Sequence, residues 1–120
     1  MKIVCIPAYN EENTISDIIR RSLKVADKVI VCDDGSTDST SKKAKDSGAT
    51  VIKHVKNSGK GTALKSLFEY IKKSNFDVAV TIDGDGQFLP EEMEKLIQPI
   101  LKNDVDIVIG NRFSNSEEMP

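Results

Sequence analysis

The chain has 120 residues, of which 38% are hydrophobic and 30% charged, and its formal net charge is −2. This length fits one compact domain over residues 1–120, and the composition allows a buried core. The small acidic excess argues against a nucleic-acid-binding protein, which usually presents a basic face, but it does not exclude a local site for one nucleotide.

The apolar runs in this sequence are all short. None approaches the roughly 20 residues that span a bilayer, and the run at the N-terminus is too short for the apolar region of a signal peptide. We therefore expect a cytoplasmic protein. Cys5 and Cys32 each lie inside an apolar run, which predicts buried thiols rather than a disulfide or a metal pair.

Short apolar runs alternate with segments of helical periodicity along the chain, a pattern typical of a parallel sheet wrapped by helices. The runs are rich in Val and Ile and scarcely alternate with polar residues, as expected for strands covered on both faces. Asp38 is predicted to cap the second helix and Gly48 to end it. The predicted strands are 3–6, 29–32, 50–52, 78–82 and 107–109, and the predicted helices are 12–24, 38–47, 60–73 and 90–101.

Polar clusters follow three of these predicted strands. Residues 7–11 follow the first strand, Asp33 and Asp34 follow the second, and residues 83–87 follow the fourth. Ligands of open parallel sheets bind in the crevice at the carboxyl ends of the strands. The three clusters together therefore predict a binding site at that edge of the sheet.

The segment Asp83-Gly84-Asp85 places two carboxylates one residue apart, with a glycine that lets the backbone turn. Such a pair can hold a hard divalent cation, Mg²⁺ or Mn²⁺, which prefers oxygen ligands. A metal there could bridge a diphosphate and neutralise the charge that builds on it as it leaves. Asp-Gly pairs are also ordinary turn formers, so this segment alone leaves a solvated turn open. Its spacing fits neither an EF-hand loop nor a dinucleotide fingerprint.

Other polar side chains are candidates for the same crevice. A carboxylate of the 33–34 pair could accept a hydrogen bond from a base, or it could cap the next helix. Tyr9 could offer a flat face to a base, or merely line a loop. Lys60 lies near a predicted helix start, which favours an anion such as a phosphate, and Arg112 could reach the crevice after the fifth strand. His54, the only histidine in the chain, ends the third strand without a partner cluster and is interpreted as structural.

Five motifs together resemble the dolichyl- and polyprenyl-phosphate sugar synthases, which transfer mannose or glucose, within the inverting GT-A glycosyltransferases. In chain order the motifs are Pro7-Ala8-Tyr9-Asn10-Glu11-Glu12, Asp33-Asp34-Gly35-Ser36-Thr37-Asp38, Asn57-Ser58-Gly59-Lys60-Gly61, Asp83-Gly84-Asp85-Gly86-Gln87 and Gly110-Asn111-Arg112. The resemblance runs to about Phe113. It implies an α/β fold of the GT-A, Rossmann-like type, with a mostly parallel sheet and helices on both faces. Because the family's domain continues well past Pro120, we expect this chain to be a truncated, nucleotide-sugar-binding portion of it.

The resemblance implies an enzyme that transfers a sugar from a GDP- or UDP-sugar to an acceptor, a polyprenyl or dolichyl phosphate or a glycan, by metal-assisted inverting displacement. It also allows homo-oligomers and peripheral association with the cytoplasmic face of a membrane. By the resemblance, Pro7, Tyr9 and Glu11 contact the nucleoside, and Cys32 and Asp34 contact the base and its neighbourhood. Asp83 and Gly84 bind the diphosphate, and Asp83 and Asp85 hold the metal and serve catalysis. Gln87 and Arg112 lie near the sugar and phosphates.

Three alternatives to such a transferase stay open. A donor-binding module without full activity would show metal-dependent binding but no transfer. A phospho-acceptor receiver domain has about this length and an acidic pair, but that pair should follow the first strand, whereas Asp33 and Asp34 follow the second. A sugar nucleotidyltransferase would show a Gly-rich loop with Arg after the first strand, and residues 7–11 are not such a loop.

Overall fold

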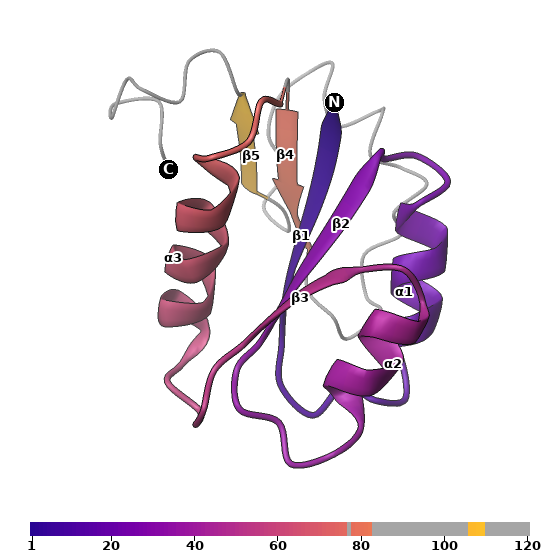
Figure 1. The fold of residues 1–120 in the computed structure, drawn as a ribbon, viewed down its shortest axis with the longest axis vertical. Helices are drawn as coiled ribbons and strands as arrows, with labels where there is room; N and C mark the ends of the chain where they lie inside the picture. The colour runs from indigo at the N-terminus through magenta and orange to yellow at the C-terminus, as the bar shows by residue number, and fades with distance from the viewer. Residues whose placement is uncertain (77, 83–105, 110–120) are drawn as a thin grey trace.

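The computed structural model describes residues 1–76, 78–82 and 106–109 of the chain. Within these residues the strands form one sheet in the order β3-β2-β1-β4-β5 (Figure 1). The strands are β1 (Lys2–Ala8), β2 (Lys28–Asp33), β3 (Thr50–Lys53), β4 (Val78–Thr81) and β5 (Asp106–Ile109). The first four are mutually parallel, and β5 pairs antiparallel with β4 at one edge. The predicted mostly parallel sheet is therefore confirmed.

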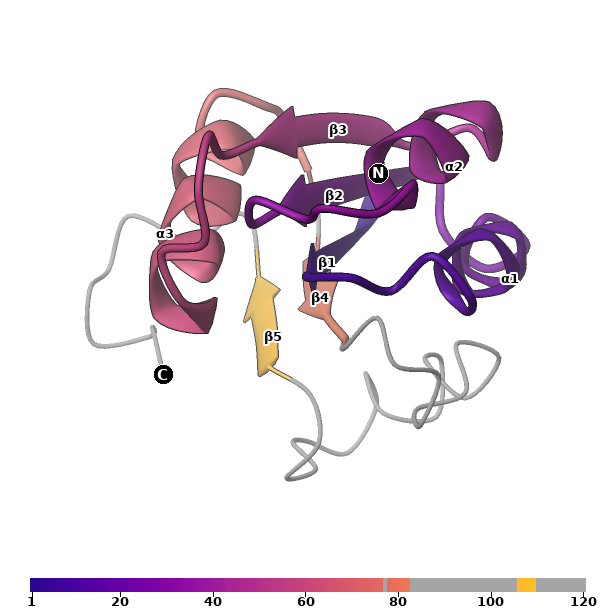
Figure 2. The same cartoon turned by 90° about the horizontal axis from the view of Figure 1, so that it is seen from below.

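Helices cover both faces of this sheet, as predicted. Figure 2 shows the sheet between α3 (Lys60–Ile71) on one side and α1 (Ile15–Ser22) with α2 (Thr40–Asp46) on the other. The two faces of β1 alternate accordingly: Val4 and Ile6 pack in the cluster with α1 and α2, while Ile3 and Cys5 pack in the cluster with α3. Because neighbouring residues of a strand point to opposite faces, a strand covered on both sides is apolar throughout.

The helices are shorter than the periodicity predicts, and local hydrogen bonds account for it. The carbonyl of Glu11 accepts from the N–H groups of Thr14 and Ile15, so a turn precedes α1. The predicted cap of α2 is wrong by one residue: Ser39 is the N-cap, and the Asp38 carboxylate accepts the N–H of Thr40 instead. That short Asx-type bond draws the chain into a turn before the helix begins.

Gly48 ends α2 as predicted. Its φ is +104°, a backbone conformation that favours glycine. The N–H of Gly48 donates to the Lys45 carbonyl, and that of Ala49 donates to the Ala44 carbonyl. These two bonds form a Schellman motif, which satisfies carbonyls that the helix end would otherwise leave unpaired.

Both cysteines are buried and unpaired, which confirms the predicted thiols. Burial raises the pKa of Cys5 to about 12, so this thiol stays neutral in the core. Of the helices that the structure describes, none is long and apolar enough to cross a lipid bilayer. The predicted helix 90–101 lies outside the described residues.

Candidate functional site

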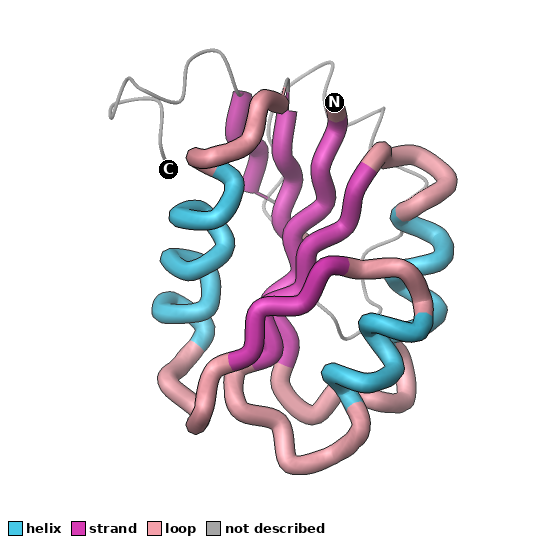
Figure 3. Tube along the Cα trace, viewed as in Figure 1, coloured by secondary structure: helices cyan, strands magenta, loops and turns pink. Residues whose placement is uncertain are grey.

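The carboxyl ends of β1, β2 and β3 lie at one end of the molecule, and Figure 3 shows their following loops gathered there. Ala8, the last residue of β1, pairs with Asp33, the last of β2. The N–H of Asp34 donates to the Ala8 carbonyl over 2.8 Å. The predicted convergence of the first two polar clusters is therefore confirmed.

The strand order reverses beside β1 at this same edge. The chain runs from β1 to β2 and β3 on one side, and β4 then pairs on the other side of β1. The N–H of Ile82 donates to the Cys5 carbonyl over 3.0 Å, so the chain after β4 is held against β1 up to Ile82. Such a reversal is a topological switch point, where open α/β sheets bind their ligands.

Part of the predicted site lies outside the described residues. This holds for Asp83, Gly84, Asp85, Gln87 and Arg112. Among residues 1–76, 78–82 and 106–109, no group of three His, Cys, Asp or Glu side chains could hold a metal ion. Asp83, the first residue of the predicted metal segment, directly follows Ile82 in the sequence. Oxygen ligands at that place would suit Mg²⁺ or Mn²⁺.

The loop after β1 is joined to the loop after β2 by reciprocal hydrogen bonds. The N–H of Asn10 donates to the Ser36 hydroxyl over 2.8 Å, and the Asn10 side-chain oxygen accepts from the N–H of Thr37 over 2.9 Å. The N–H of Glu11 donates to the Thr40 hydroxyl over 2.9 Å. Asn10 has a φ of +53°, which asparagine tolerates better than most residues. These bonds hold both loops in one arrangement.

The residues predicted to contact a nucleoside differ in exposure. Tyr9 is 44% exposed, so its ring is accessible to a ligand. Pro7 is buried within β1, and Cys32 is fully buried in the cluster under α3. Burial, and then the charges of Asp34 and Asp33, raise the pKa of the Cys32 thiol to about 12. The structure thus places Cys32 beneath the site, and the roles of these residues stay predictions.

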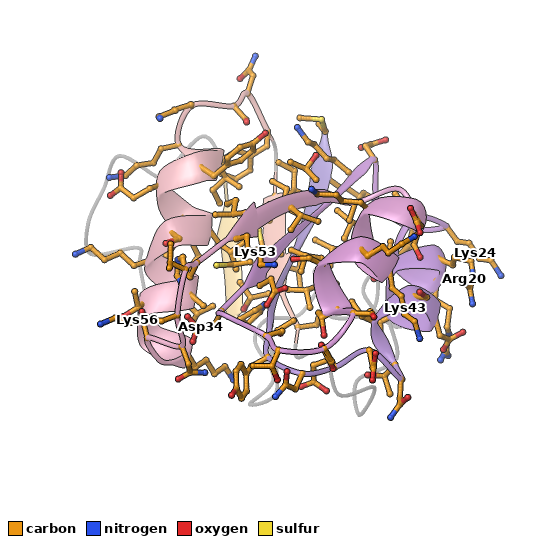
Figure 4. The ribbon with its side chains drawn as sticks, turned by 60° about the horizontal axis from the view of Figure 1, so that its bottom comes forward. Arg20, Lys24, Asp34, Lys43, Lys53 and Lys56 are labelled. Carbon is orange, nitrogen blue, oxygen red and sulfur yellow. The ribbon has the colours of Figure 1, made fainter. Side chains whose placement is uncertain are left out.

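Asp34 is almost completely buried, at 3% exposure, and its carboxylate holds the loop that follows β3. One oxygen lies 2.8 Å from Nδ1 of His54 and 3.0 Å from the N–H nitrogen of Ser58, and the other lies 2.7 Å from that of Gly59. Burial by itself raises the pKa of Asp34, but hydrogen bonds from His54, Ser58 and Gly59 outweigh it and lower the pKa below its ordinary value. Figure 4 shows Asp34 beside Lys56, near the start of α3.

The prediction that His54 lacks a partner cluster is wrong. Besides Asp34, the ring contacts the Ser66 hydroxyl of α3, with Nε2 to Oγ at 2.8 Å, and lies 3.5 Å from the Cys32 sulfur. The parallel register explains this, because Asp33 pairs with Lys53 and the next residues, Asp34 and His54, then fall side by side. Aligning the second and third predicted strands in parallel register was the sequence signal that could have placed His54 beside Asp34.

Gly35 allows the turn after β2 to lie directly against the same loop. Its φ is +78°, and a Cβ at this position would lie 2.4 Å from the backbone nitrogen of Asn57 and 2.4 Å from the carbonyl carbon of Lys56. Only a residue without a side chain fits such an approach. The Asp34-Gly35 turn and the loop 54–59 are therefore packed backbone to backbone.

The other carboxylate of the acidic pair serves α2. Asp33 is 1% exposed, accepts the N–H of Ser36 over 2.9 Å and bonds the hydroxyl of Ser41 in the first turn of α2. Asp33 therefore holds the turn before α2 and a side chain of its first turn, but it accepts no backbone N–H of the described helix and is not its cap. Lys60 is the first residue of α3, which confirms the predicted helix start. The N–H groups of a first turn point out of the helix and favour an anion.

Comparison with known proteins shows which family this chain resembles. The family described as Glycosyl transferase family 2 matches residues 3–119. The UDP-N-acetylglucosamine–dolichyl-phosphate N-acetylglucosaminyltransferase of Methanococcus voltae is 35% identical, over 94% of this chain and 52% of its own length. The dolichol-phosphate mannosyltransferase of Pyrococcus furiosus is 35% identical, over 94% of this chain and 34% of its own. The chain thus spans about half, or less, of these relatives.

A solved structure supports the same fold. Glucosyl-3-phosphoglycerate synthase from Mycobacterium tuberculosis, in complex with Mn²⁺, UDP and glucosyl-3-phosphoglycerate, superimposes with a TM-score of 0.66 at 34% identity. The match covers 82% of this chain and 39% of that one.

Replacing Gly35 by Ala should destabilise the chain by at least about 2 kcal/mol, because the methyl group meets backbone atoms and the positive φ becomes strained. Gly61→Ala is the matched control: a Cβ there meets no described atom within 4 Å, and alanine favours the helix. Urea unfolding measures both variants. Equal stability of Gly35→Ala and the wild type would contradict the packed turn.

The lowered pKa of Asp34 predicts acid sensitivity. Because the carboxyl has a lower pKa folded than unfolded, its contribution is complete above the unfolded value of about 3.9 and is lost as the pH falls through the folded value. The free energy of unfolding should therefore decrease with acidification below about pH 4. This decrease should be shallower in Asp34→Asn and unchanged in Asp46→Asn, an exposed acid on α2. Parallel slopes in all three proteins, from urea unfolding at several pH values, would refute the assignment.

Proposed function

The chain belongs to glycosyl transferase family 2, and we propose that it binds a nucleotide-diphosphate sugar, a UDP- or GDP-sugar, at the switch-point edge and takes part in sugar transfer. The observation that carries the proposal is the convergence of the loops after β1 and β2 beside β4, in a chain where Asp83-Gly84-Asp85 follow Ile82, one residue after the end of β4. The curated relatives named above transfer N-acetylglucosamine or mannose and support the same class of reaction.

The nucleoside side of this proposed site is formed by the loops after β1 and β2. Tyr9 offers an exposed ring on which a base can stack. Tyr9 lies between the end of β1 and two anchored residues: Asn10 bonds the loop after β2, and Glu11 bonds Thr40 at the start of α2, so this segment is held before the ligand arrives. A preorganised loop loses little conformational entropy on binding, which favours affinity.

The diphosphate side is proposed to involve Lys60, Gln87 and Arg112, with Asp83 and Asp85 holding a divalent cation. When bound, Mg²⁺ or Mn²⁺ would neutralise the charge on the departing nucleoside diphosphate. The Mn²⁺ and UDP in the mycobacterial synthase complex support a cation of this kind. Lys60 is the first residue of α3 and directly follows the loop 54–59, so its ammonium group can approach a phosphate there.

We expect calorimetric titration to show binding of a UDP- or GDP-sugar in the presence of Mn²⁺, with a Kd on the order of micromolar to millimolar. Asp85→Ala should weaken this binding at least about tenfold, because a metal ligand is lost. Asp46→Ala, on an exposed end of α2, is the control and should bind as the wild type does. Absence of binding by every sugar nucleotide tested with metal would refute the proposed function, whereas retained binding in Asp85→Ala would refute only the ligand assignment.

For the acceptor, we propose a polyprenyl or dolichyl phosphate, supported by the names of the two dolichyl-phosphate relatives. We further propose that transfer takes place at the cytoplasmic face of a membrane. An acceptor phosphate is already anionic, so attack on the sugar needs no dedicated protein base. Incubating the chain with labelled donor, Mn²⁺ and either polyprenyl phosphate in vesicles or 3-phosphoglycerate in solution separates the acceptor classes. Labelled lipid is the expected product. Labelled phosphoglycerate would instead favour a product like the glucosyl-3-phosphoglycerate bound to the mycobacterial synthase, and binding without either product would favour a donor-binding module.

A further inference from the structure

His54 is the one histidine of the chain, and the chemistry proposed above does not use it. Its ring is mostly buried, with 17% of the side chain exposed. The ring joins three elements: Asp34 after β2, Ser66 in α3 and the loop 54–59 to which it belongs. A buried imidazole with a partner on each nitrogen is held in one orientation.

The neighbours of the ring determine its protonation pattern. The lowered pKa of Asp34 keeps this carboxyl ionised, so it can only accept, and Nδ1 of His54 must carry the donated proton. In a neutral ring Nε2 is then the acceptor, and the Ser66 hydroxyl donates to it. The Cys32 thiol, 3.5 Å from Nε2, closes the inner side of the ring.

The order Ser66, His54 and Asp34 is also that of a hydrolytic triad, but its surroundings do not suit nucleophilic attack. A triad serine needs donors placed for the oxyanion that forms next to it. Ser66 lies in the middle of α3, where backbone N–H groups donate within the helix. The arrangement is therefore suited to fixing positions rather than to forming an acyl-enzyme.

Among the described residues, the three groups that bond the Asp34 carboxylate belong to the loop 54–59: the ring of His54 and the N–H groups of Ser58 and Gly59. Gly59 is the N-cap of α3, and Lys60 begins that helix. The ring thus fixes the carboxylate that fixes the loop, and the loop determines where α3 starts. Gly35, packed against Lys56 and Asn57, holds the loop from its other side.

We infer that His54 is a positioning residue of the donor site, which acts through Asp34 and the loop 54–59 to hold the start of α3 in the arrangement that receives the phosphates of the sugar nucleotide. This inference rests on the proposed function. Without the ring, the loop samples other arrangements, and apparent affinity falls by the fraction of time that the competent one is populated. At metal sites, replacing a residue that orients a ligand-binding group without touching the ligand typically changes affinity 10- to 100-fold, and we expect an effect of this size here.

The test compares His54→Ala, His54→Asn, His54→Gln and Ser66→Ala by titration with UDP-glucose and GDP-mannose in the presence of Mn²⁺, with thermal unfolding measured alongside. His54→Ala should weaken binding of the preferred donor about tenfold or more. An asparagine amide can donate from near the place of Nδ1, so His54→Asn should recover most of this loss, whereas His54→Gln, whose amide lies near Nε2, should not. Ser66→Ala should stay within about threefold of the wild type, because the bond to Asp34 remains.

Amide hydrogen exchange at Ser58 and Gly59 gives a second measurement, independent of the ligand. Exchange at both amides should be faster in His54→Ala than in the wild type, and slow again in His54→Asn. If His54→Ala does not fold, the contrast between the Asn and Gln variants tests the same point.

Several outcomes would overturn the inference. Donor affinity in a folded His54→Ala equal to that of the wild type would do so while leaving the proposed function intact. Equal binding by the Asn and Gln variants, or ester hydrolysis by the wild type that Ser66→Ala abolishes, would also overturn it. Failure of the wild type to bind any sugar nucleotide would overturn the proposed function and this inference together.

Discussion

The buried carboxylate of Asp34 is the interaction on which the described edge of the site depends. A charged group at 3% exposure is stable only when hydrogen bonds replace the water it has lost. Here one ring nitrogen and two backbone N–H groups do so. Since all three come from the loop 54–59, desolvation of one side chain is coupled to the conformation of a whole loop. Removing either the Asp34 carboxylate or its donors in the loop 54–59 would leave buried polar groups unpaired, and this costs more free energy than the hydrogen bond itself contributes.

The sheet explains why these residues meet at all. Parallel strands place their carboxyl ends at one edge, so the residue after each strand faces the residue after its neighbour. Ala8 beside Asp33, and Asp33 beside Lys53, are consecutive steps of that register. Hydrogen bonds of Asn10 and Thr40 then join the segment after β1 to the segment after β2. The Asp34 carboxylate joins the segment after β2 to Gly59, the N-cap of α3. The loops are thus linked by hydrogen bonds on the side where a nucleoside is proposed to bind.

Much of this fold could be predicted from the periodicity of apolar residues and from the glycines that end helices. Apolar runs without alternation predicted buried strands, and Gly48 predicted a helix end that the structure confirms. The loops were less accessible to sequence reasoning, because their hydrogen bonds connect residues 20 or more positions apart, such as His54 to Asp34. The packing of Gly35 against Lys56 and Asn57 could not be predicted either, because it depends on how β3 and the loop after it are placed. Likewise, the N-cap of α2 lies one residue later than predicted, at Ser39, although it is the Asp38 carboxylate that accepts the N–H of Thr40, the first residue of the helix.

The use of Asp34 also narrows what this carboxylate can do for a ligand. A carboxylate offers about four acceptor positions, and three are taken by the protein. Counting the bonds among the described residues, the position left for a base N–H is on the oxygen that accepts from Gly59. Selection of a base would then be coupled to the loop that starts α3, since both share one carboxylate. If a base does bond Asp34, the nucleoside and phosphate sides of the proposed site would not be independent. A change in the loop 54–59 would alter the acceptor that the base meets, and the bound base would restrain the loop that precedes Lys60.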